Sequence, residues 1–464
     1  MTTGGLAEAL SRRLPAQILL TAPADLDAHA HDETEDLKSR PVLVVVPRTE
    51  DEVRSLLAAA SELRFPVTPQ GARTGLSGGA LPSTGGVALD LTRMNRILEV
   101  DRENLFAVVE PGVVTQTLQE EVEKAGLFYP PDPSSRGSCT LGGNIAENAG
   151  GPRAAKYGTT GRYVSGLRVV LPGGAVLALG GKNRKDVAGY DLVPLFVGSE
   201  GTLGVVTQAT LRLVPFPTHR RLLWASFAEE GQALAAVARL YARESEPSAC
   251  EFMERRAAEV SAGWLSLALP ADADAHLFVE ADGFEEDAVA RDAERYGEIM
   301  LASGALDVRV AMAEREVRDF WRVRRAVGEA VKSLGPYAEE DCTVPRSELP
   351  ALLSAVRRVA ASHRLDAVCY GHAADGNIHV NVVQPSGAGE RWAAGRARAV
   401  EEIFREVVAL GGTITGEHGV GVTQRAYLGL RHSPEVVAAM RGIKRLFDPE
   451  GILNPGKIFE DLHA

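Results

Sequence analysis

Cysteine is scarce in this sequence, and its few cysteines are widely spaced. The four are Cys139, Cys250, Cys342 and Cys369, and no two of them form a CxxC pair. An iron–sulfur cluster or a zinc ribbon needs closely spaced cysteines, so neither can be assembled from these residues. We therefore expect free thiols, most of them buried.

Long apolar runs and an excess of positive charge are also missing. No stretch approaches the roughly 20 apolar residues of a membrane-spanning helix, and the start MTTGGLAEALSRRLP lacks the apolar core of a secretory signal. We expect no transmembrane segment and a cytoplasmic protein, with peripheral attachment to a membrane through a partner as the alternative. The net charge is −12 and the basic residues are scattered among acidic ones, which argues against nucleic acid as a partner.

The chain is long enough for two domains. It has 464 residues, of which 45% are hydrophobic and 24% charged, and it contains no low-complexity tract. The sequence PFPTHR at 215–220 suggests a domain boundary, and strand and helix patterns on both sides of it predict α+β domains. Strands are expected at 42–47, 66–69, 86–91, 96–101, 105–112, 207–214, 221–227, 249–255, 276–283, 367–372 and 377–383. Helices are expected after a capping box at Thr49 and Glu52, from about Thr117 to Gly126, and near 229–243, 285–302 and 388–410.

Three glycine-rich segments adjoin expected strands. They are GARTGLSGGALP (71–82), LGGNIAENAGG (141–151) and VGSEGTLGVVT (197–207). Glycine lets backbone N–H groups approach a phosphate closely. None of the segments has the GxGxxG or Walker A pattern, so a nicotinamide site of the Rossmann type has no support. One such loop can be purely structural, but three favour the walls of one cleft for an extended, phosphate-bearing cofactor.

The segment GHAADGNIHVN (371–381) predicts a pair of facing histidines. Asp375–Gly376 is typical of a two-residue hairpin loop with a type I′ turn, which needs positive φ at both central positions. In that register His372 pairs directly with His379, with Cβ atoms ~5 Å apart. Two imidazoles at this separation suit one divalent metal ion. Two ordinary hydrogen-bonded histidines are the alternative.

Other polar residues belong to the same pattern. Tyr370 and Asn381 share the face of the two histidines by the strand period of two. In GGTITGEHGVG (411–421), Glu417 and His418 stand in a glycine-rich loop. We expect these two to be buried, and burial of unpaired ionisable groups is costly, which indicates a functional role. A structural ion pair is the alternative.

The order of these segments resembles the FAD-binding domain of the vanillyl-alcohol oxidase and p-cresol methylhydroxylase superfamily. The C-terminal motifs at 371–381 and 411–421 narrow the resemblance to the D-lactate, D-2-hydroxyglutarate and glycolate dehydrogenase branch, over about residues 38–460. It implies an α+β fold, with a two-subdomain FAD-binding domain of the p-cresol methylhydroxylase type, an α+β cap and a C-terminal return to the flavin. The expected division is an N-terminal helical segment 1–37, an FAD-binding domain 38–217 and a substrate- and metal-binding cap 218–464.

The resemblance also implies which residues contact FAD. The 71–79 loop and Pro111–Gly112 would hold the pyrophosphate and ribityl region, and the later segments would line the rest. The expected contacts are Gln70, Gly71, Arg73, Thr74, Gly75, Leu76, Gly79, Pro111, Gly112, Asp132, Pro133, Ser135, Gly142, Gly143, Asn144, Glu200, Gly201, Gly204 and Asn454. Some relatives attach the flavin through a histidine near the first loop. Here Ala80 follows Gly79, so non-covalent FAD is expected.

The same resemblance implies a metal and a reaction. The metal ligands would be His372, His379 and Glu417. His418 would be the catalytic base, Asn381 a substrate contact and Arg324 the holder of the substrate carboxylate, although Arg324 alone would be interpreted as a solvated helix residue. The metal would lower the pKa of the hydroxyl of a D-2-hydroxy acid, His418 would take its proton, and hydride would pass to flavin N5. Zinc is expected, with iron or manganese as alternatives.

Two positions depart from the 2-hydroxyglutarate enzymes. Glu339 stands where those have a lysine for a second carboxylate, and Gln424 replaces a basic residue, although Arg425 is adjacent. Both departures favour a monocarboxylate such as D-lactate or glycolate.

Several alternatives stay open. Within the family they are a D-2-hydroxyglutarate dehydrogenase and the flavin subunit of a glycolate oxidase complex. An external electron acceptor is expected in any case: an electron-transfer flavoprotein, a quinone or a separate iron–sulfur subunit. From other classes, a metal-dependent hydrolase leaves the glycine loops unexplained, and a non-catalytic flavin-binding regulator is disfavoured by His418.

Overall fold

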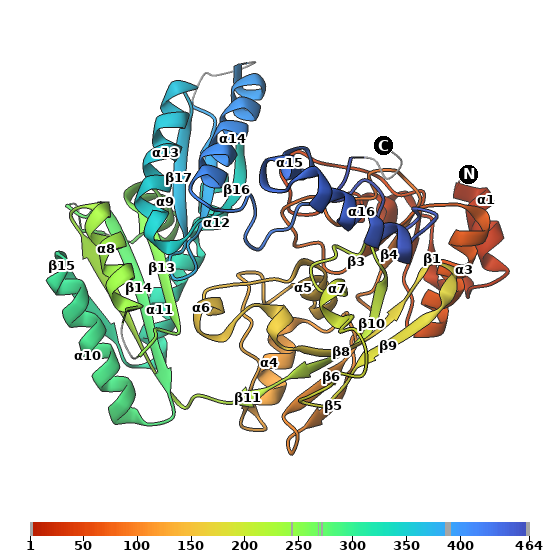
Figure 1. Cartoon of the computed structure of the whole chain (residues 1–464), viewed down its shortest axis with the longest axis horizontal. Coiled ribbons are helices and arrows are strands. Elements are labelled where there is room, and N and C mark those ends of the chain that lie inside the picture. The colour runs from red at the N-terminus through yellow and green to blue at the C-terminus, as the bar shows by residue number, and fades with distance from the viewer. Residues whose placement is uncertain (1–2, 243–244, 268, 271, 386–390, 461–464) are drawn as a thin grey trace. The chain divides into compact units, whose positions relative to one another are not determined.

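The computed structural model describes residues 3–242, 245–267, 269–270, 272–385 and 391–460 (Figure 1). The chain forms two compact units. The first unit comprises Met1–Gly150, Thr159–Pro215 and Glu417–Ala464, and the second comprises Gly151–Gly158 and Phe216–Gly416.

The first unit contains a four-stranded sheet in the order β1-β2-β4-β3. Its strands are β1 (Leu19–Leu20), β2 (Leu43–Val45), β4 (Val87–Asp90) and β3 (Val67–Gln70). The helix α3 (Glu50–Leu63) follows β2 and begins at Thr49, where Thr49 and Glu52 form the predicted capping box. The buried side chains of α3 pack against those of β2, β3 and β4 in one apolar core.

A five-stranded antiparallel sheet, in the order β5-β6-β10-β8-β9, completes the β-structure of this unit together with a short β11-β7 pair. The strands are β5 (Ile97–Asp101), β6 (Phe106–Val109), β10 (Val205–Arg212), β8 (Val164–Val170), β9 (Val176–Gly180), β11 (Val214–Pro215) and β7 (Leu127–Phe128). The other helices are α1 (Thr3–Ser11), η1 (Ala16–Ile18), α2 (Pro23–Ala28), α4 (Thr115–Glu123), α5 (Leu141–Glu147), η2 (Thr160–Arg162), η3 (Pro172–Gly174), α7 (Val193–Phe196), η5 (Arg425–Tyr427), α15 (Leu428–Arg431) and α16 (Pro434–Phe447).

The second unit is built on a seven-stranded antiparallel sheet in the order β15-β12-β14-β13-β17-β18-β16. The strands are β15 (Ala305–Ala311), β12 (His219–Phe227), β14 (Ala275–Gly283), β13 (Ala249–Glu254), β17 (Asp366–His372), β18 (Asn377–Val383) and β16 (Tyr337–Thr343). The helices are α6 (Ala154–Tyr157), α8 (Glu230–Leu240), α9 (Arg255–Leu265), α10 (Glu286–Ala302), α11 (Glu314–Arg325), α12 (Val327–Lys332), η4 (Arg346–Glu348), α13 (Leu349–Ser362) and α14 (Arg391–Ala409).

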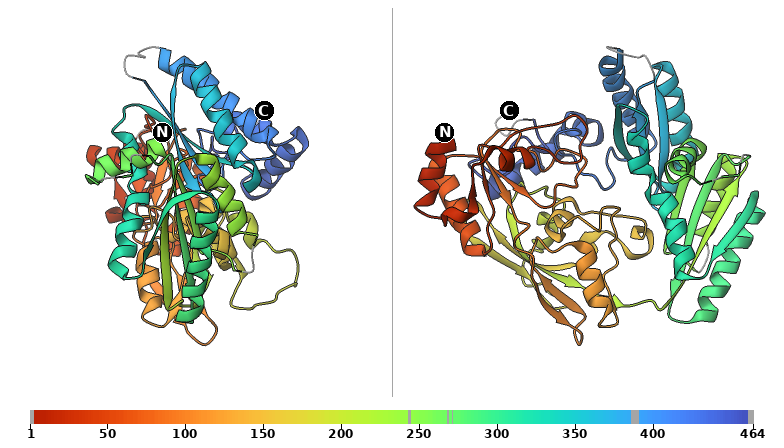
Figure 2. Two further views of the ribbon diagram at one scale, coloured as in Figure 1. Left: turned by 90° about the vertical axis from the view of Figure 1, so that its left-hand side faces the viewer. Right: turned by 180° about the vertical axis from the view of Figure 1, so that it is seen from behind.

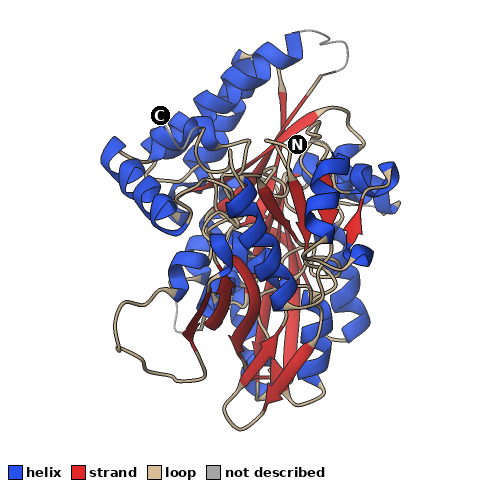
Figure 3. Cartoon of the chain, turned by 90° about the vertical axis from the view of Figure 1, so that its right-hand side faces the viewer, coloured by secondary structure: helices blue, strands red, loops and turns tan. Residues whose placement is uncertain are grey.

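Helices cover the seven-stranded sheet. Helices α9, α11 and α12 pack on the face that carries Trp224, Met253, Phe278 and Tyr370. Helices α8, α10, α13 and α14 contact the strands as a second group, and the long helices beside the green and cyan strands are visible in Figure 2. Both units contain helices and strands. Figure 3 shows both kinds of element by colour, and the α+β expectation is confirmed.

The strands and helices expected from the sequence are all present, with ends that shift by a few residues; position 243 of one expected helix and positions 388–390 of another lie outside the described residues. The four cysteines are free and buried, as expected. None of the described helices is both long enough and apolar enough to cross a membrane.

The contacts divide the chain differently from the sequence in two segments. Residues 151–158 group with the second unit, where Arg153 contacts Glu280 and Lys156 contacts Asp282. Residues 417–464 group with the first unit. There Leu453 forms a parallel bridge with Val67 of β3, so the C-terminal segment returns to the first sheet.

The predicted register of the hairpin at 371–381 is wrong. His379 pairs with Tyr370, and His372 pairs with Asn377, so the loop has four residues, 373–376. Only Gly376 among these has positive φ (75°), which excludes a type I′ turn.

The reason for this register lies outside the hairpin. The backbone N–H of Ala374 donates to the carbonyl of Cys250 on the neighbouring strand β13, at 3.1 Å. Arg346 Nε donates to the carbonyl of Ala374 at 2.8 Å. These contacts hold the loop in its longer form.

Candidate functional site

The predicted FAD-binding segments of the first unit pack against one another. Gly142 approaches the 111–112 segment so closely that a Cβ atom on it would lie 2.6 Å from the Cβ of Pro111. A Cβ on Gly71 would lie 2.4 Å from Thr140 Oγ1, so the first loop also contacts the second. Glycine is therefore needed at both contacts.

The third glycine-rich loop and the C-terminal segment join the same cluster. Gly198 and Glu200 donate their backbone N–H groups to the carbonyls of Ile145 and Ala146 in α5, at 2.9 and 2.8 Å. The buried side chain of Asn454 donates to the carbonyls of Gly79 and Glu200, at 3.0 and 2.7 Å. Asn454 thereby connects the first and third loops.

Buried polar atoms in this cluster fit a polar cofactor. Gln70 Nε2 donates to the carbonyls of His29 and Ala80, whereas Gln70 Oε1 has no hydrogen-bond partner among the described residues. The same is true of Thr140 Oγ1. Buried polar atoms are normally satisfied, so these two indicate a ligand with donor groups. Thr140 was not among the predicted residues, although a threonine directly before a glycine-rich helix could have suggested it.

Some predicted FAD contacts have other partners. Asn144 Nδ2 donates to Thr115 Oγ1 at 2.7 Å, and a Cβ on Gly204 would lie 2.4 Å from Val169 Cγ1. Packing and internal hydrogen bonds thus explain why some of the predicted FAD contacts, such as Asn144 and Gly204, occur in these segments. The remaining predicted residues, Arg73, Thr74, Gly75, Leu76, Gly112, Asp132, Pro133, Ser135, Gly143 and Gly201, lie in the same segments of the first unit.

Glu200 supports the loop that bears Glu417 and His418. Its carboxylate accepts the backbone N–H groups of Val420 and Gly421, both at 2.7 Å. Burial raises the pKa of Glu200, and burial beside Glu200 raises the pKa of Glu147 well above its usual range. The Glu200 carboxylate therefore anchors the loop at Val420 and Gly421.

Glu417 and His418 are half-buried, so the expectation that both are buried is wrong. A Cβ on Gly150 would lie 2.5 Å from Glu417 Oε2, which places the Glu417 carboxylate beside that glycine. Directly before Glu417, Gly416 belongs to the second unit, and its N–H donates to Asp341 Oδ2 at 2.7 Å.

The two predicted histidines share one face of the second sheet. In the observed register His372 and His379 are diagonal neighbours rather than a direct cross-strand pair. Their ring centroids are 5.3 Å apart. Ligand nitrogens of the two rings lie within 4.8 Å of each other. Two such nitrogens, with a carboxylate, form a donor set that divalent zinc, iron or manganese accepts.

The neighbouring strand β16 adds acidic groups to this face. Asp341 pairs with His379 in register, and its Oδ1 accepts from Asn377 Nδ2 at 2.6 Å. Glu339 Oε1 lies 3.8 Å from His379 Nδ1. Burial, together with the nearby Glu339 carboxylate, holds the pKa of Tyr370 well above its usual range, so its hydroxyl stays protonated.

Arg324 is buried, contrary to its interpretation as a solvated helix residue. Only 4% of its surface is exposed, and Nη2 lies 2.7 Å from Glu251 Oε2. Its guanidinium also stacks over the ring of Tyr370, 5.0 Å from the centroid. Val317, Trp321 and Arg324 share the buried stripe of α11, a spacing that could have indicated this position.

Polar atoms without partners occur on this face too. Arg324 Nε has no hydrogen-bond partner among the described residues, and the amide of Asn381 has none at ordinary geometry, although it faces the Tyr370 hydroxyl closely enough to lower the pKa of that hydroxyl. Asn381 is 1% exposed. A buried guanidinium donor and a buried amide left unsatisfied indicate a ligand with acceptor and donor groups.

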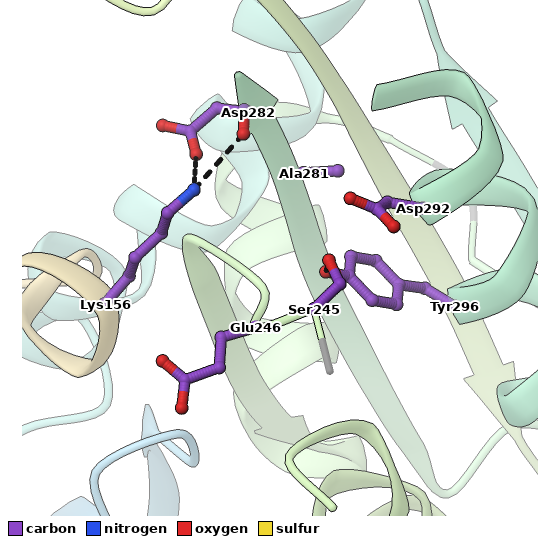
Figure 4. Close-up of a pocket in the computed structure, with 7 residues that line it drawn as sticks. All are labelled: Lys156, Ser245, Glu246, Ala281, Asp282, Asp292 and Tyr296. Carbon is purple, nitrogen blue, oxygen red and sulfur yellow. Dashed lines mark hydrogen bonds and ion pairs between the residues drawn. The ribbon is translucent and has the colours of Figure 1, made fainter. Parts of the chain in front are cut away.

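A pocket elsewhere in the second unit contains none of the predicted residues (Figure 4). Its lining residues are Lys156, Ser245, Glu246, Ala281, Asp282, Asp292 and Tyr296. Lys156 Nζ contacts both the carboxylate and the carbonyl of Asp282, and Tyr157 Oη donates to the same carboxylate. These contacts fasten the 151–158 segment to β14.

Comparison with known proteins identifies the class. Residues 41–180 match the family model described as FAD binding domain, and residues 216–458 match FAD linked oxidases, C-terminal domain. The chain belongs to the family of FAD-linked oxidases, and the resemblance inferred from its motifs is confirmed. FAD is the cofactor that this family membership supports.

Relatives narrow the comparison. The chain is 43% identical to the glycolate oxidase subunit GlcD of Bacillus subtilis (strain 168) over 93% of its own length and 92% of that protein. It is 35% identical to the D-lactate dehydrogenase of Anaerostipes hadrus, over 98% and 97% of the two chains. The solved structure of p-cresol methylhydroxylase with substrate bound has a TM-score of 0.82 and 18% identity, covers 100% of this chain and 98% of its own, and shows the same fold.

Proposed function

We propose that the protein oxidises a D-2-hydroxy acid, D-lactate or a similar monocarboxylate, to the 2-oxo acid with FAD as hydride acceptor. The observation that carries the proposal is the grouping of Arg324, His372 and His379 on one buried face of the second sheet. A cation and two imidazoles match the carboxylate and the hydroxyl of such a substrate. The names of the relatives, a glycolate oxidase subunit and a D-lactate dehydrogenase, support the same substrate class.

Arg324 and Asn381 bind and orient the substrate in this proposal. The Nε atom of Arg324 is buried and lacks a partner, so it can donate to a substrate carboxylate in a charge-assisted hydrogen bond. Asn381 offers both a donor and an acceptor from the same face. Together they fix which side of the α-carbon carries the hydrogen to be removed.

His418 removes the hydroxyl proton. It is half-buried, in the loop that Glu200 holds through the N–H groups of Val420 and Gly421. His372, His379 and Glu417 would hold the metal ion, zinc first, with iron or manganese as alternatives. Bound metal would lower the pKa of the hydroxyl, and bound FAD would accept the hydride.

Glu339 favours a monocarboxylate over D-2-hydroxyglutarate, because its carboxylate lies on the same face as His379 and Asn381. A flavin subunit of a glycolate oxidase complex is the second candidate, since one relative is named as such a subunit. In either case an electron-transfer flavoprotein, a quinone or a separate iron–sulfur subunit would reoxidise the flavin. The FAD would be non-covalent, since Ala80 follows Gly79.

The test is anaerobic bleaching of the flavin by a panel of D- and L-2-hydroxy acids. We expect D-lactate or glycolate to bleach the visible flavin absorbance and L-lactate to leave it unchanged. A flavin that no 2-hydroxy acid reduces, or that only L-enantiomers reduce, contradicts the proposal. A colourless protein with hydrolase activity would point to the metal-dependent hydrolase instead.

A further inference from the structure

Glu251 is a fully buried carboxylate that contacts two predicted site residues at once. It is the third residue of β13, and its exposed fraction is 0%. Oε1 lies 2.7 Å from His372 Nδ1, and Oε2 lies 2.7 Å from Arg324 Nη2. These three side chains come from β13, β17 and α11, all in the second unit.

A carboxylate in this position requires both partners. An isolated buried carboxylate is very unfavourable, and removing one partner of a buried pair is strongly destabilising. Apolar side chains such as Met253 and Tyr370 surround it on the same face of the sheet. The contacts therefore define how His372 and Arg324 are held.

The contact to His372 determines where its ring proton sits. Nδ1 is next to a carboxylate, which only accepts, so Nδ1 carries the proton and donates to Oε1. Nε2 is then the nitrogen assigned to a metal ion. A carboxylate behind a histidine ligand orients the ring and raises the basicity of the ligating nitrogen.

The contact to Arg324 determines the orientation of its guanidinium. Oε2 of Glu251 forms an ion pair with Nη2 at 2.7 Å without hydrogen-bond geometry, and Nε has no hydrogen-bond partner among the described residues. A planar guanidinium that is held at one nitrogen presents its remaining donors in a fixed direction. The same anion thus positions both the carboxylate-binding cation and the metal ligand.

We propose that Glu251 is a positioning residue that couples metal binding at His372 to substrate binding at Arg324. The proposal rests on the function proposed above. It predicts that loss of the Glu251 carboxylate weakens metal and substrate binding together, although Glu251 touches neither.

Glu251→Gln is the informative variant, because an amide has one acceptor and one donor side. With its oxygen toward His372, its NH2 group faces the donors of Arg324. With its oxygen toward Arg324, its NH2 group donates to Nδ1 of His372, which moves the ring proton to Nε2 and blocks metal coordination. Glutamine therefore satisfies only one of the two partners.

Glu254→Gln is the matched control. Glu254 lies on the same strand and is also buried, but its carboxylate contacts Arg357 and the backbone N–H of Cys369. The Glu254→Gln variant therefore measures the general effect of removing a buried carboxylate from β13.

The experiment measures zinc affinity by competition with a chromophoric chelator on the full chain with FAD bound. We expect Glu251→Gln to weaken zinc binding by about 10- to 100-fold, the usual effect of losing such a partner, and to raise KM for D-lactate. Glu254→Gln should leave zinc affinity and KM within about twofold of the wild type. Thermal unfolding of the zinc-free proteins separates these effects from a general loss of stability.

The outcomes separate this inference from the proposed function. If the wild type binds zinc and Glu251→Gln binds it equally well with an unchanged KM for D-lactate, Glu251 positions neither His372 nor Arg324 and only the inference fails. If the wild type binds no zinc, iron or manganese and turns over D-lactate after chelation, the metal proposal fails and the inference with it. If Glu251→Gln does not fold, Glu251→Leu combined with Arg324→Met removes both the acceptor for His372 and the unpaired cation, and unchanged zinc affinity in that protein would equally overturn the inference.

Discussion

Glu339 shows how one side chain can select among related substrates. Its carboxylate lies 3.8 Å from His379 Nδ1, and its residue pairs with Asn381 across the strands. A second substrate carboxylate on this face would meet a like charge in a poorly screened environment. Such repulsion amounts to a few kcal/mol, on the order of a hundredfold in specificity.

We therefore predict that kcat/KM for D-lactate exceeds that for D-2-hydroxyglutarate by about a hundredfold. Glu339→Lys should reduce or reverse the ratio, and Glu339→Gln should give an intermediate value, since it removes the charge but keeps the shape. Steady-state kinetics with both acids checks this. Preference of the wild type for D-2-hydroxyglutarate would contradict the role of Glu339.

His276 makes the stability of the second unit sensitive to pH. It is buried in β14, and Nδ1 accepts a hydrogen bond from Trp224 Nε1 at 3.1 Å. Burial lowers the pKa of His276 to about 4. Between pH 6.5 and 4 the unfolded chain binds a proton that the folded chain does not, so stability decreases as the pH falls through this range.

We predict that this histidine contributes about 3 kcal/mol to the decrease in unfolding free energy between pH 6.5 and 4. His276→Asn keeps an acceptor for Trp224 but does not titrate, so its decrease should be smaller by that amount. Urea unfolding at several pH values measures both proteins. Parallel pH profiles of the two would refute the assignment.

At the scale of the element, the 373–376 loop of the hairpin depends on Gly376. Its φ is 75°, and a Cβ atom there would lie 1.9 Å from the carbonyl oxygen of Val344. The carbonyl of Gly376 also accepts the N–H of Val344 at 3.0 Å. Both the conformation and the contact exclude a side chain.

Gly376→Ala should destabilise the protein by more than the roughly 1–2 kcal/mol that a left-handed alanine costs. The extra cost arises because the backbone at Val344, directly after β16, would have to move away from the added Cβ. Gly173→Ala is the control, since Gly173 has φ 80° but no atom within 4 Å of an added Cβ. The difference between the two variants in lost unfolding free energy therefore measures the steric clash at Val344. Equal destabilisation would show that the loop relaxes freely.

At the scale of the whole molecule, the predicted cofactor residues and the predicted histidine ligands belong to different units. The residues expected to contact FAD all lie in the first unit, whereas His372 and His379 lie in the second. Loss of a metal ligand should therefore leave the flavin site intact.

His372→Ala should lose its metal ion and reduce turnover by about a thousandfold or more, since metal polarisation of a hydroxyl contributes several kcal/mol. The protein should stay yellow and release FAD on acid denaturation. Metal analysis, the flavin spectrum and kinetics check the three parts, with chelator-treated wild type as the control. Loss of FAD from the variant would show that the two sites are not independent.

Short-range patterns made much of the fold predictable. The capping box at Thr49, the alternating strands and the three glycine-rich loops each depend on neighbouring residues. The strand β16 was not predicted, because its sequence YAEEDCT is acidic rather than alternately apolar. Two of its acidic residues face polar groups from other segments, Glu339 beside His379 and Asp341 beside Asn377 and Gly416.

The alternation of strand residues alone predicts that His372 and His379 share a face, and this holds despite an error in register. The true pairing differs from the predicted one by two positions, and a shift by an even number keeps every side chain on its side of the sheet. The four-residue loop, the burial of Arg324 and the position of Glu251 cannot be read from local patterns and emerge only once the chain is folded. They depend on contacts between residues distant in sequence, such as Cys250 with Ala374 and Glu251 with both Arg324 and His372, which local periodicity does not encode.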